Sequence, residues 1–401
     1  MDKEGNKKSN KEKKTSLPPK RGQIKARIFE ECKEAMVPIQ TAITTVYAPA
    51  VASGGVASLS LQTVLSSFGI AFDIDGVILR GTTPIGNSQR ALRRLCDDSG
   101  ALKIPFLFLT NGGGTPESRR AFELSDLLGV KILPSQVMQG HSSFRTLLKR
   151  FENEFIVATG KGEPAVVMSE YGFKKVISLD EYTAHFNNID PVAHYKRWTT
   201  MQESRNPGKI VSSSSDYSQK VKAAFVVSDP VDWRRDIQVL CDILTSGGVP
   251  GEENGPQPLY ILLLMIYNTR LAAFPSERLG MGAFRIALES VFNRIQSKPL
   301  EYTSFGKPNP FVFRNAETVL RHLLQSSHSS NGTENANAGL PSFKTLYMIG
   351  DNPFAGYPWF SILTRTGVFR QRENHTQYPA DVVVDTVEEA VEFILKREDA
   401  F

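Results

Sequence analysis

The 401-residue sequence is poor in the residues that build disulfide frameworks and zinc sites, with only three cysteines and six histidines. Cys32, Cys96 and Cys241 lie far apart and form no CxxC pair. This spacing indicates neither a disulfide framework nor a zinc site, and it fits a reducing compartment. The histidines are scattered and form no HExxH motif, so none is selected as a catalytic or metal-binding residue.

The sequence also lacks an apolar run of membrane-spanning length. Residues 35–72 carry no charge, but Pro38, Pro49 and many Ser and Thr residues interrupt them. Because a transmembrane helix needs about 20 predominantly apolar residues, we expect no stable membrane span. A basic segment followed by Ser-, Thr- and Ala-rich sequence is typical of an organelle transit peptide, although three acidic residues among the first twelve count against one. Linker and targeting segment therefore both stay open for residues 1–67.

The net charge of +5 is confined to one end of the chain. Residues 1–35 hold eleven Lys or Arg and six Asp or Glu, so the remainder is neutral. The stretch MDKEGNKKSNKEKK is almost free of apolar residues, which is typical of a solvated, disordered tail. A nucleic-acid-binding arm would need interleaved aromatic residues or a recognition motif. The sequence has neither, so we expect no nucleic-acid partner.

The composition is that of a globular enzyme or binding protein, with 41% hydrophobic and 22% charged residues. A chain of 401 residues is longer than one compact core commonly uses. We therefore expect two domains, or one domain that carries a large insertion.

Beyond residue 68, short apolar runs alternate with helix-like segments. FGIAFDI and IPFLFL are typical of buried strands, and TPESRRAFELSDLLG is expected to form a helix with Thr115 as N-cap and Gly129 at its end. The alternation recurs around EFIVATG and AAFVVSD, and again around LYMIG, FSILT and DVVVD. It predicts an α/β fold with a doubly wound parallel sheet and a separate α/β subdomain.

Polar residues stand where several of these strands end. Asp73 and Asp75 follow the first run, Thr110 and Asn111 follow the second, Asp351 follows LYMIG, and Lys307 lies on a Gly-Lys-Pro turn. In a doubly wound sheet the carboxyl ends of the strands form the ligand crevice. Taken singly, each residue also fits an ordinary role: the aspartates as turn or helix caps, Thr110 as a strand end, and Lys307 as a solvated amine.

The order of the pieces is more distinctive than any one of them. DxDG after a strand, Thr-Asn-Gly after the next, a long insertion, Gly-Lys-Pro and then Gly-Asp-Asn-Pro resemble the haloacid dehalogenase superfamily of phosphatases over residues 68–395. The insertion is similar to a class IIA cap. GHSSFRTLLKRF, DPVDWRRDIQVLCD, RLGMGAFRIALESVF and EYTSFGKPNP resemble the cat eye syndrome critical region protein 5 branch.

The resemblance implies a division of the chain into four parts. Residues 1–67 would be a disordered basic tail with an uncharged linker or targeting segment. Residues 68–134 and 298–401 would form a core of the haloacid dehalogenase-like Rossmannoid type. Residues 135–297 would form the inserted α/β cap domain.

The resemblance also implies a catalytic role for three residues. Asp73 would attack a substrate phosphorus and form an aspartyl-phosphate. Asp75 would protonate the leaving oxygen and then activate the hydrolytic water. Lys307 would balance charge on the nucleophile and on the phosphoryl group.

The remaining site residues would bind phosphate and metal. The implied phosphate-binding set is Gly76, Thr110, Asn111 and Gly112. The implied metal is Mg²⁺, held by the Asp73 and Asp351 side chains and the Asp75 carbonyl. The partner would be a small phosphorylated substrate, which the sequence does not identify; oligomeric state stays open as well.

Two segments depart from the pattern. Gly356 stands where relatives carry a second acidic residue, and LYILLLMIY in the cap replaces a polar segment. The first departure favours an alternative to the phosphatase: a catalytically impaired binding or regulatory protein with the same fold. The branch resemblance implies a mitochondrial location and a place in glycerophospholipid metabolism, with the cytoplasm as the other location.

Overall fold

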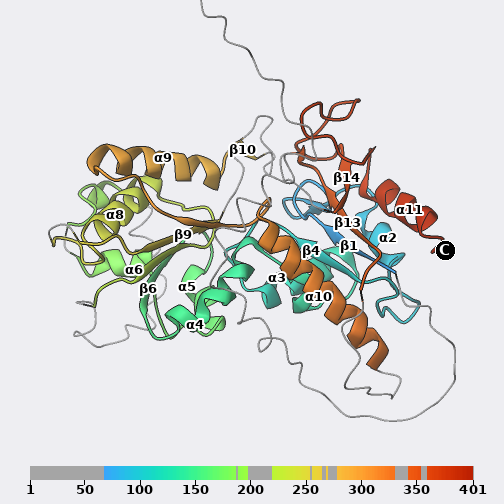
Figure 1. The fold of residues 1–401 in the computed structure, drawn as a ribbon, viewed down its shortest axis with the longest axis horizontal. Coiled ribbons are helices and arrows are strands. Elements are labelled where there is room, and N and C mark those ends of the chain that lie inside the picture. Colours follow the sequence, from blue (N-terminus) through green and yellow to red (C-terminus); the bar gives the residue numbers. More distant parts are fainter. Residues whose placement is uncertain are drawn as a thin grey trace, which may run out of the picture.

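The structure is a computed structural model that describes residues 67–186, 188–196, 219–252, 255–263, 268–269, 278–329, 342–353 and 359–400. The predicted tail and linker, except Ser67, lie outside these residues, as does Gly356. Two parallel sheets with helices packed on them lie next to each other, one in each half of the molecule (Figure 1). The α/β class and the doubly wound architecture are confirmed.

The larger sheet has the strand order β15-β14-β13-β1-β4-β5, and every neighbouring pair is parallel. Its strands are β1 (Phe68–Phe72), β4 (Phe106–Leu109), β5 (Val137–Met138), β13 (Thr345–Gly350), β14 (Phe360–Thr364) and β15 (Val382–Val384). Its helices are α2 (Ser88–Arg93), α3 (Glu117–Leu128), α10 (Pro310–Ser329) and α11 (Val387–Arg397). We call this part the core.

Side chains of the core strands point alternately to two hydrophobic clusters. Phe72 and Phe108 pack with α2, α3 and α11 on one face, while Ala71 and Leu109 pack with α10 on the other. Because successive strand residues point to opposite faces, a strand covered on both sides must be apolar throughout. The uninterrupted run FGIAF, all five residues of which are buried, meets this requirement.

The smaller sheet is also parallel, with the order β12-β9-β8-β6-β7. Its strands are β6 (Phe155–Thr159), β7 (Lys175–Ser178), β8 (Ala223–Val226), β9 (Leu259–Leu263) and β12 (Thr303–Phe305). Its helices are α4 (Leu148–Phe151), α5 (Pro164–Glu170), α6 (Leu179–Ala184), α8 (Trp233–Thr245) and α9 (Met281–Ile295). We call this part the cap; its buried side chains form one cluster.

Short elements complete the described chain. Two small antiparallel ribbons are β2 (Leu79–Arg80) with β3 (Thr83–Pro84) and β10 (Asn268–Thr269) with β11 (Arg278–Leu279). The 3₁₀ helices are η2 (Pro134–Gln136), η3 (Gly140–Leu147) and η4 (Ala193–Tyr195). No helix of the described residues is long and apolar enough to cross a membrane.

The two sheets divide the chain at slightly different places from the boundaries that the sequence predicts. Strand β5, at residues 137–138, pairs with β4 in the core sheet, although residue 135 was the expected start of the cap. Strand β12, at residues 303–305, pairs with β9 in the cap sheet, although residue 298 was the expected return to the core. Strands of two and three residues are too short to show a period in the sequence, so only their pairing assigns them.

Of the two predictions about the ends of α3, the C-terminal one is confirmed and the N-terminal one is wrong. Gly129 ends α3 in the left-handed conformation with φ of 60°, as a C-terminal glycine commonly does. Thr115 is not the N-cap of that helix, because the helix begins at Glu117 and Pro116 occupies the cap position.

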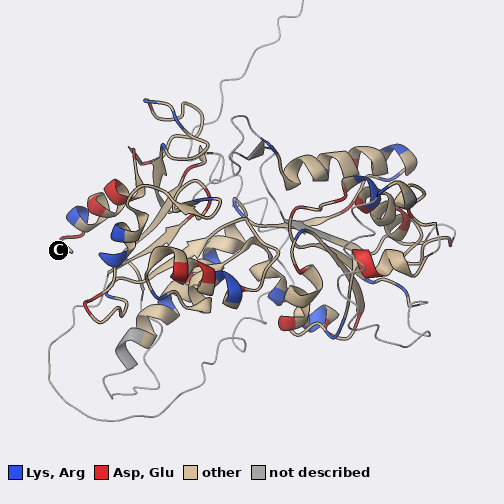
Figure 2. Cartoon of the chain, turned by 180° about the vertical axis from the view of Figure 1, so that it is seen from behind, with Lys and Arg blue, Asp and Glu red and all other residues tan. Residues whose placement is uncertain are grey.

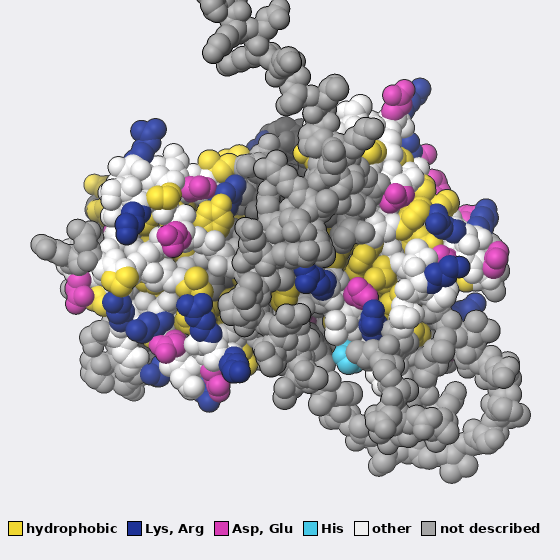
Figure 3. All heavy atoms as spheres, in the orientation of Figure 1, with side chains coloured by type: hydrophobic (Ala, Val, Ile, Leu, Met, Phe, Trp, Pro, Cys, Tyr) yellow, Lys and Arg dark blue, Asp and Glu magenta, His cyan; other side chains and the backbone are white. Residues whose placement is uncertain are grey.

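Charges are spread over the surface of both parts. Figure 2 shows Lys, Arg, Asp and Glu mainly on helices and loops, while the sheets are mostly tan. On the face drawn in Figure 3, side chains of both signs are interspersed between apolar ones. Both described cysteines, Cys96 and Cys241, are free thiols.

Candidate active site

Three neighbouring strands of the core end at one edge of the sheet. Strand β1 pairs with β13 on one side and with β4 on the other, all in parallel. Asp73 directly follows β1, Asp351 follows β13 and Thr110 follows β4. Since parallel strands end at the same edge, the topology brings these three residues together.

Lys307 reaches the same place from the far end of the cap insertion. Its Nζ donates to Asp73 Oδ2 at 2.6 Å and to the carbonyl of Leu109 at 2.7 Å. Only 3% of Lys307 is exposed. A buried ammonium is stable only with such partners, and here one of them is the carboxylate that the resemblance implies as the nucleophile.

Asn111 holds the backbone of Lys307. Its side-chain amide donates to the Lys307 carbonyl at 2.9 Å, and its side-chain oxygen accepts from the Lys307 amide at 2.7 Å. The sequence predicts Asn111 as a phosphate-binding residue. That role was expected of the backbone amide and stays a prediction; the side chain acts as a clamp that joins the loop after β4 to the Gly-Lys-Pro turn.

Asp351 is buried against two glycines. Its Oδ2 accepts from the Val368 amide at 2.8 Å, and a Cβ atom would lie 2.4 Å from that oxygen at Gly76 and 1.9 Å from it at Gly367. Burial and the negative charge of Asp73 raise the pKa of Asp351 well above its ordinary range. Both glycines are therefore required by the close approach of this carboxylate.

Gly76 makes room for Asp351, and the phosphate contact that the resemblance implies for backbone amides near it stays a prediction. Its amide donates to the carbonyl of Leu79 at 2.8 Å, so it is not offered to a phosphate. Its φ of 82° and its contact with Asp351 explain why glycine stands there.

Thr110 and Gly112 lie beside the second aspartate. The Gly112 amide donates to Thr110 Oγ1 at 3.0 Å, and a Cβ at Gly112 would lie 3.3 Å from Asp75 Oδ2. Thr110 is only 5% exposed. A hydroxyl that accepts one hydrogen bond keeps its own proton for another acceptor, such as an anionic oxygen.

The environment of Asp75 favours a protonated carboxyl group. Burial and the neighbouring charge of Asp73 raise its pKa, while the positive charges of Arg120, Lys161 and Lys307 act in the opposite direction. A raised pKa increases the protonated fraction of the carboxyl group, which is the direction that a general acid needs.

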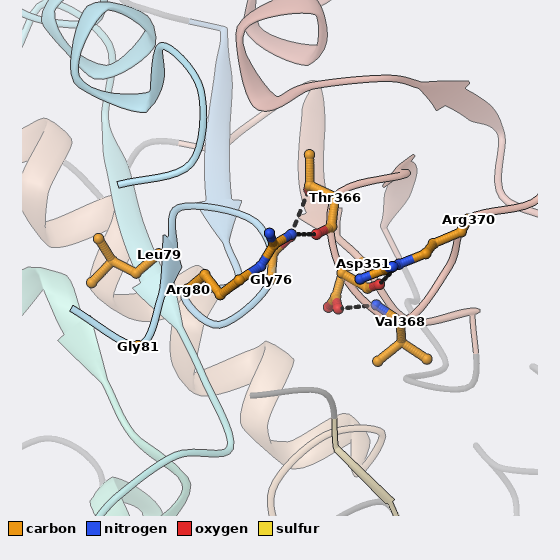
Figure 4. Close-up of a pocket in the computed structure, with 9 residues that line it drawn as sticks. Gly76, Leu79, Arg80, Gly81, Asp351, Thr366, Val368 and Arg370 are labelled. Atoms are coloured by element: carbon orange, nitrogen blue, oxygen red, sulfur yellow. Dashed lines mark hydrogen bonds between the residues drawn. The ribbon is translucent and has the colours of Figure 1, made fainter. Parts of the chain in front are cut away.

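The loops around Asp351 form a small pocket, shown in Figure 4. Thr366 Oγ1 donates to the Gly76 carbonyl at 2.6 Å, and the Arg80 guanidinium donates to the Thr366 carbonyl at 2.7 Å. These bonds join the ribbon after β1 to the loop after β14. The lining residues are Gly76, Leu79, Arg80, Gly81, Asp351, Thr366, Gly367, Val368 and Arg370.

Sequence reasoning missed a buried histidine at the junction of core and cap. His141 Nδ1 lies 2.6 Å from the Tyr171 hydroxyl, which donates to Glu117. Burial lowers the pKa of His141 to about 4, so the ring is neutral near pH 7. A Cβ at Gly113 would lie 2.5 Å from the His141 ring, so the ring supports the loop that contains Gly112. Its only sequence signal is its place in GHSSF.

Asp73 and Asp351 stand at the same edge of the core sheet, and the resemblance implies that both are metal ligands. Burial and the charge of Asp73 raise the pKa of Asp351, and Lys307 forms its ion pair with Asp73. The described residues contain no group of three or more His, Cys, Asp and Glu side chains suited to a metal. Two carboxylates and a carbonyl suit Mg²⁺, which keeps several waters and also binds substrate phosphate.

Comparison with known proteins finds similarity to hydrolases. A model of the family described as haloacid dehalogenase-like hydrolase matches residues 70–174. A mitochondrial hydrolase of Saccharomyces cerevisiae is 28% identical over 84% of this chain and 97% of its own length. A cardiolipin synthase / mitochondrial hydrolase fusion protein of Schizosaccharomyces pombe is 31% identical over 84% of this chain, which spans only 55% of that relative.

Solved structures share the fold at low identity. A possible sugar phosphatase of the haloacid dehalogenase superfamily from Cytophaga hutchinsonii has a TM-score of 0.54 and 13% identity, covering 83% of this chain and 99% of that one. A hypothetical protein from Pyrococcus horikoshii has a TM-score of 0.52 and 20% identity, covering 81% and 99%. Residues 70–174 are thus similar in sequence to the haloacid dehalogenase-like hydrolases, and the described chain shares its fold with the solved structures.

Proposed function

We propose that the protein is a Mg²⁺-dependent phosphatase that hydrolyses a small phosphorylated molecule through an aspartyl-phosphate. The observation that carries the proposal is the buried contact between Lys307 Nζ and Asp73 Oδ2, 2.6 Å long. It lies at the edge of the core sheet where Thr110 and Asp351 follow the ends of β4 and β13. It fixes one carboxylate oxygen of Asp73 and leaves the nucleophile in a defined orientation.

The first step transfers the phosphoryl group to the protein. An Asp73 carboxylate oxygen attacks phosphorus, a new P–O bond forms, and the bond to the leaving oxygen breaks. Asp75 gives its proton to that oxygen, which departs as an alcohol. The raised pKa of Asp75 supports this role, because the residue must enter the step protonated.

The second step returns Asp73 to its starting state. Asp75, now a carboxylate, takes a proton from a water molecule as the water oxygen attacks phosphorus. The P–O bond to Asp73 breaks, and inorganic phosphate leaves. Asp75 ends the cycle protonated, so protons and electrons balance over the two steps.

Lys307 and Thr110 stabilise charge on the transferred group. The Lys307 ammonium contacts Asp73 and bears the positive charge nearest to the developing negative charge on phosphorus oxygens. The Thr110 hydroxyl supplies a hydrogen-bond donor at the same edge. Both are buried, so their interactions act in a medium of lower dielectric than water.

Asp73, Asp351 and the Asp75 carbonyl would hold Mg²⁺. When bound, the ion supplies positive charge that orients and polarises the phosphate and offsets the repulsion between the two carboxylates. Asp351 keeps its orientation through the Val368 amide and the two glycines.

The names of relatives support the substrate class and the place of action. Both curated relatives are named as mitochondrial hydrolases, which supports a mitochondrial location. A p-nitrophenyl phosphatase from Archaeoglobus fulgidus shares the fold. A role in glycerophospholipid metabolism, implied by the branch resemblance, belongs to the same proposal.

Phosphate release tests the proposed function. The full chain is assayed with 4-nitrophenyl phosphate and a panel of small phosphomonoesters, with Mg²⁺ and with EDTA. Activity that requires Mg²⁺ and is abolished in Asp73→Asn supports the proposal. The matched control is Asp98→Asn, which makes the same change at an exposed position and should keep full activity. Activity retained in Asp73→Asn would exclude covalent catalysis by this residue.

A further inference from the structure

A lysine of the cap stands against the loop that follows the candidate phosphate-binding residues. Lys161 lies between β6 and α5, where a cap strand ends. Its carbonyl is so close to Gly114 that a Cβ there would lie 2.2 Å away, and the Glu163 amide donates to the Gly114 carbonyl at 2.7 Å. Gly114 is two residues beyond Gly112, so the cap meets the core at the site itself.

The backbone of Lys161 is fixed on both sides. Its amide donates to the Asp229 carbonyl at 2.8 Å, and its carbonyl accepts from Ser228 Oγ at 2.7 Å. Gly160 and Gly162 flank it with φ values of 139° and 84°. The loop therefore presents the Lys161 side chain from a defined position.

The Lys161 side chain remains able to change partners. It is 55% exposed, and its Nζ lies 3.6 Å from Asp229 Oδ2, a long contact for an ion pair. Exposed ion pairs of this kind stabilise little. Burial raises the pKa of Asp229, while the Lys161 ammonium and the Met281 amide at the start of α9 act in the opposite direction.

Lys161 lies against the loop that packs on Asp75, because its carbonyl contacts Gly114 and a Cβ at Gly112 would lie 3.3 Å from Asp75 Oδ2. Lys161 from the cap and Arg120 from α3 both act on the pKa of Asp75, whereas Lys307 is bonded to Asp73. A general acid must lie within hydrogen-bond reach of the leaving oxygen, so side chains around Asp75 surround the leaving group. Arg120 already has a close partner, since its Nη1 donates to Glu123 at 3.0 Å.

We infer that Lys161 is a specificity-determining residue whose ammonium binds a carboxylate on the leaving group of the phosphomonoester. The single positive charge of the Lys161 ammonium balances the single negative charge of a carboxylate. A second phosphate group would carry two negative charges, and the neighbouring Asp229 carboxylate would repel the additional one. The inference rests on the proposed function, because it places the leaving group next to Asp75.

Ligand binding tests the inference without turnover. The Asp73→Asn chain is titrated by calorimetry with 3-phosphoglycerate and with glycerol 3-phosphate, which differ by a carboxylate in place of a hydroxymethyl group. We expect 3-phosphoglycerate to bind at least about tenfold more tightly, the effect of one charge-assisted hydrogen bond. Adding Lys161→Met should remove this preference and change the affinity for glycerol 3-phosphate by less than about threefold. Lys161→Arg should retain the preference.

Lys174→Met is the matched control. Lys174 is another exposed cap lysine, paired with Glu152 at 2.7 Å, and its loss should alter neither affinity. Equal weakening of both ligands by Lys161→Met would show that the residue supports the loop and does not select the ligand. No preference before substitution, or a preference that survives it, would also overturn the inference.

The proposed function is tested separately in the unmodified chain with 4-nitrophenyl phosphate. Failure to release phosphate there, together with Lys161-dependent binding of 3-phosphoglycerate, would refute the phosphatase activity and leave the binding site in place. Phosphate release without the carboxylate preference would refute the binding site alone.

Discussion

Substituting Gly367 by alanine should displace Asp351 with little direct strain on the backbone. Gly367 does not lie in the left-handed region, but its added Cβ would be 1.9 Å from Asp351 Oδ2 and 2.5 Å from Cγ. Ordinary contact between such atoms begins at roughly 3.5 Å, so the carboxylate must move by more than about 1 Å. The hydrogen bond from the Val368 amide, 2.8 Å long, is lost or stretched by that movement.

The expected loss of activity follows from this displacement. A misplacement near 1 Å in an active site reduces the rate by on the order of 100-fold. A hydrogen bond to a charged group contributes about 1.5–3 kcal/mol, so the free energy of unfolding should fall by a similar amount. We expect Gly367→Ala to remain folded, to need more Mg²⁺ and to release phosphate about 100-fold more slowly.

Gly86→Ala is the control for the substitution itself. Gly86 has φ of 54° and nothing within 4 Å of an added Cβ, so alanine there costs only about 1–2 kcal/mol of left-handed strain. Thermal unfolding, a Mg²⁺ titration and phosphate release are measured for both variants. If Gly367→Ala folds and keeps the activity and metal requirement of Gly86→Ala, the position of Asp351 does not govern catalysis and the reasoning fails.

Three further predictions concern the site and its support. Asp75→Asn should release phosphate far more slowly than the unmodified chain while Asp73→Asn releases none; near-normal rates for Asp75→Asn in the same assay would remove it as the acid. Lys307→Met leaves Asp73 without its buried partner and should lower the free energy of unfolding in urea by about 3 kcal/mol and abolish activity; an unchanged urea midpoint would contradict the buried pair. The lowered pKa of His141, about 4, means that the unfolded chain binds a proton first as pH falls, so stability is full above about pH 6.5 and drops by about 3 kcal/mol towards pH 4. Urea unfolding across this range should show a smaller drop in His141→Gln, and an identical drop would refute the assignment.

Much of the fold was accessible from the sequence because buried parallel strands leave a clear pattern. FGIAF, FLFL and TLYMIG are nearly continuous apolar runs, which only strands covered on both faces require. Each run is followed by a polar residue, and parallel strands end at one edge. Asp73, Thr110 and Asp351 could therefore be grouped before any coordinates were known.

Other features depended on contacts between distant segments. The resemblance implies that the backbone amide near Asn111 binds phosphate, and the structure adds that the Asn111 side chain binds the backbone of Lys307, 196 residues away in the sequence. The close approach of Asp351 to Gly76, across most of the chain, was likewise not visible in the sequence. Strand β5 belongs to the core sheet and β12 to the cap sheet, the reverse of what the predicted domain boundaries give. Such short strands show no periodicity in the sequence, so only their pairing assigns them.

The sequence by itself determined which chemical groups are available and at which strand ends they stand, because hydrophobic periodicity and motif order are properties of neighbouring residues. Only the tertiary structure decided which of those groups touch one another. Because the two sheets pack against each other, Lys307 donates to Asp73 and the charge of Lys161 in the cap acts on Asp75. Such contacts depend on distances of a few ångströms between segments far apart in the chain, and no local pattern encodes them.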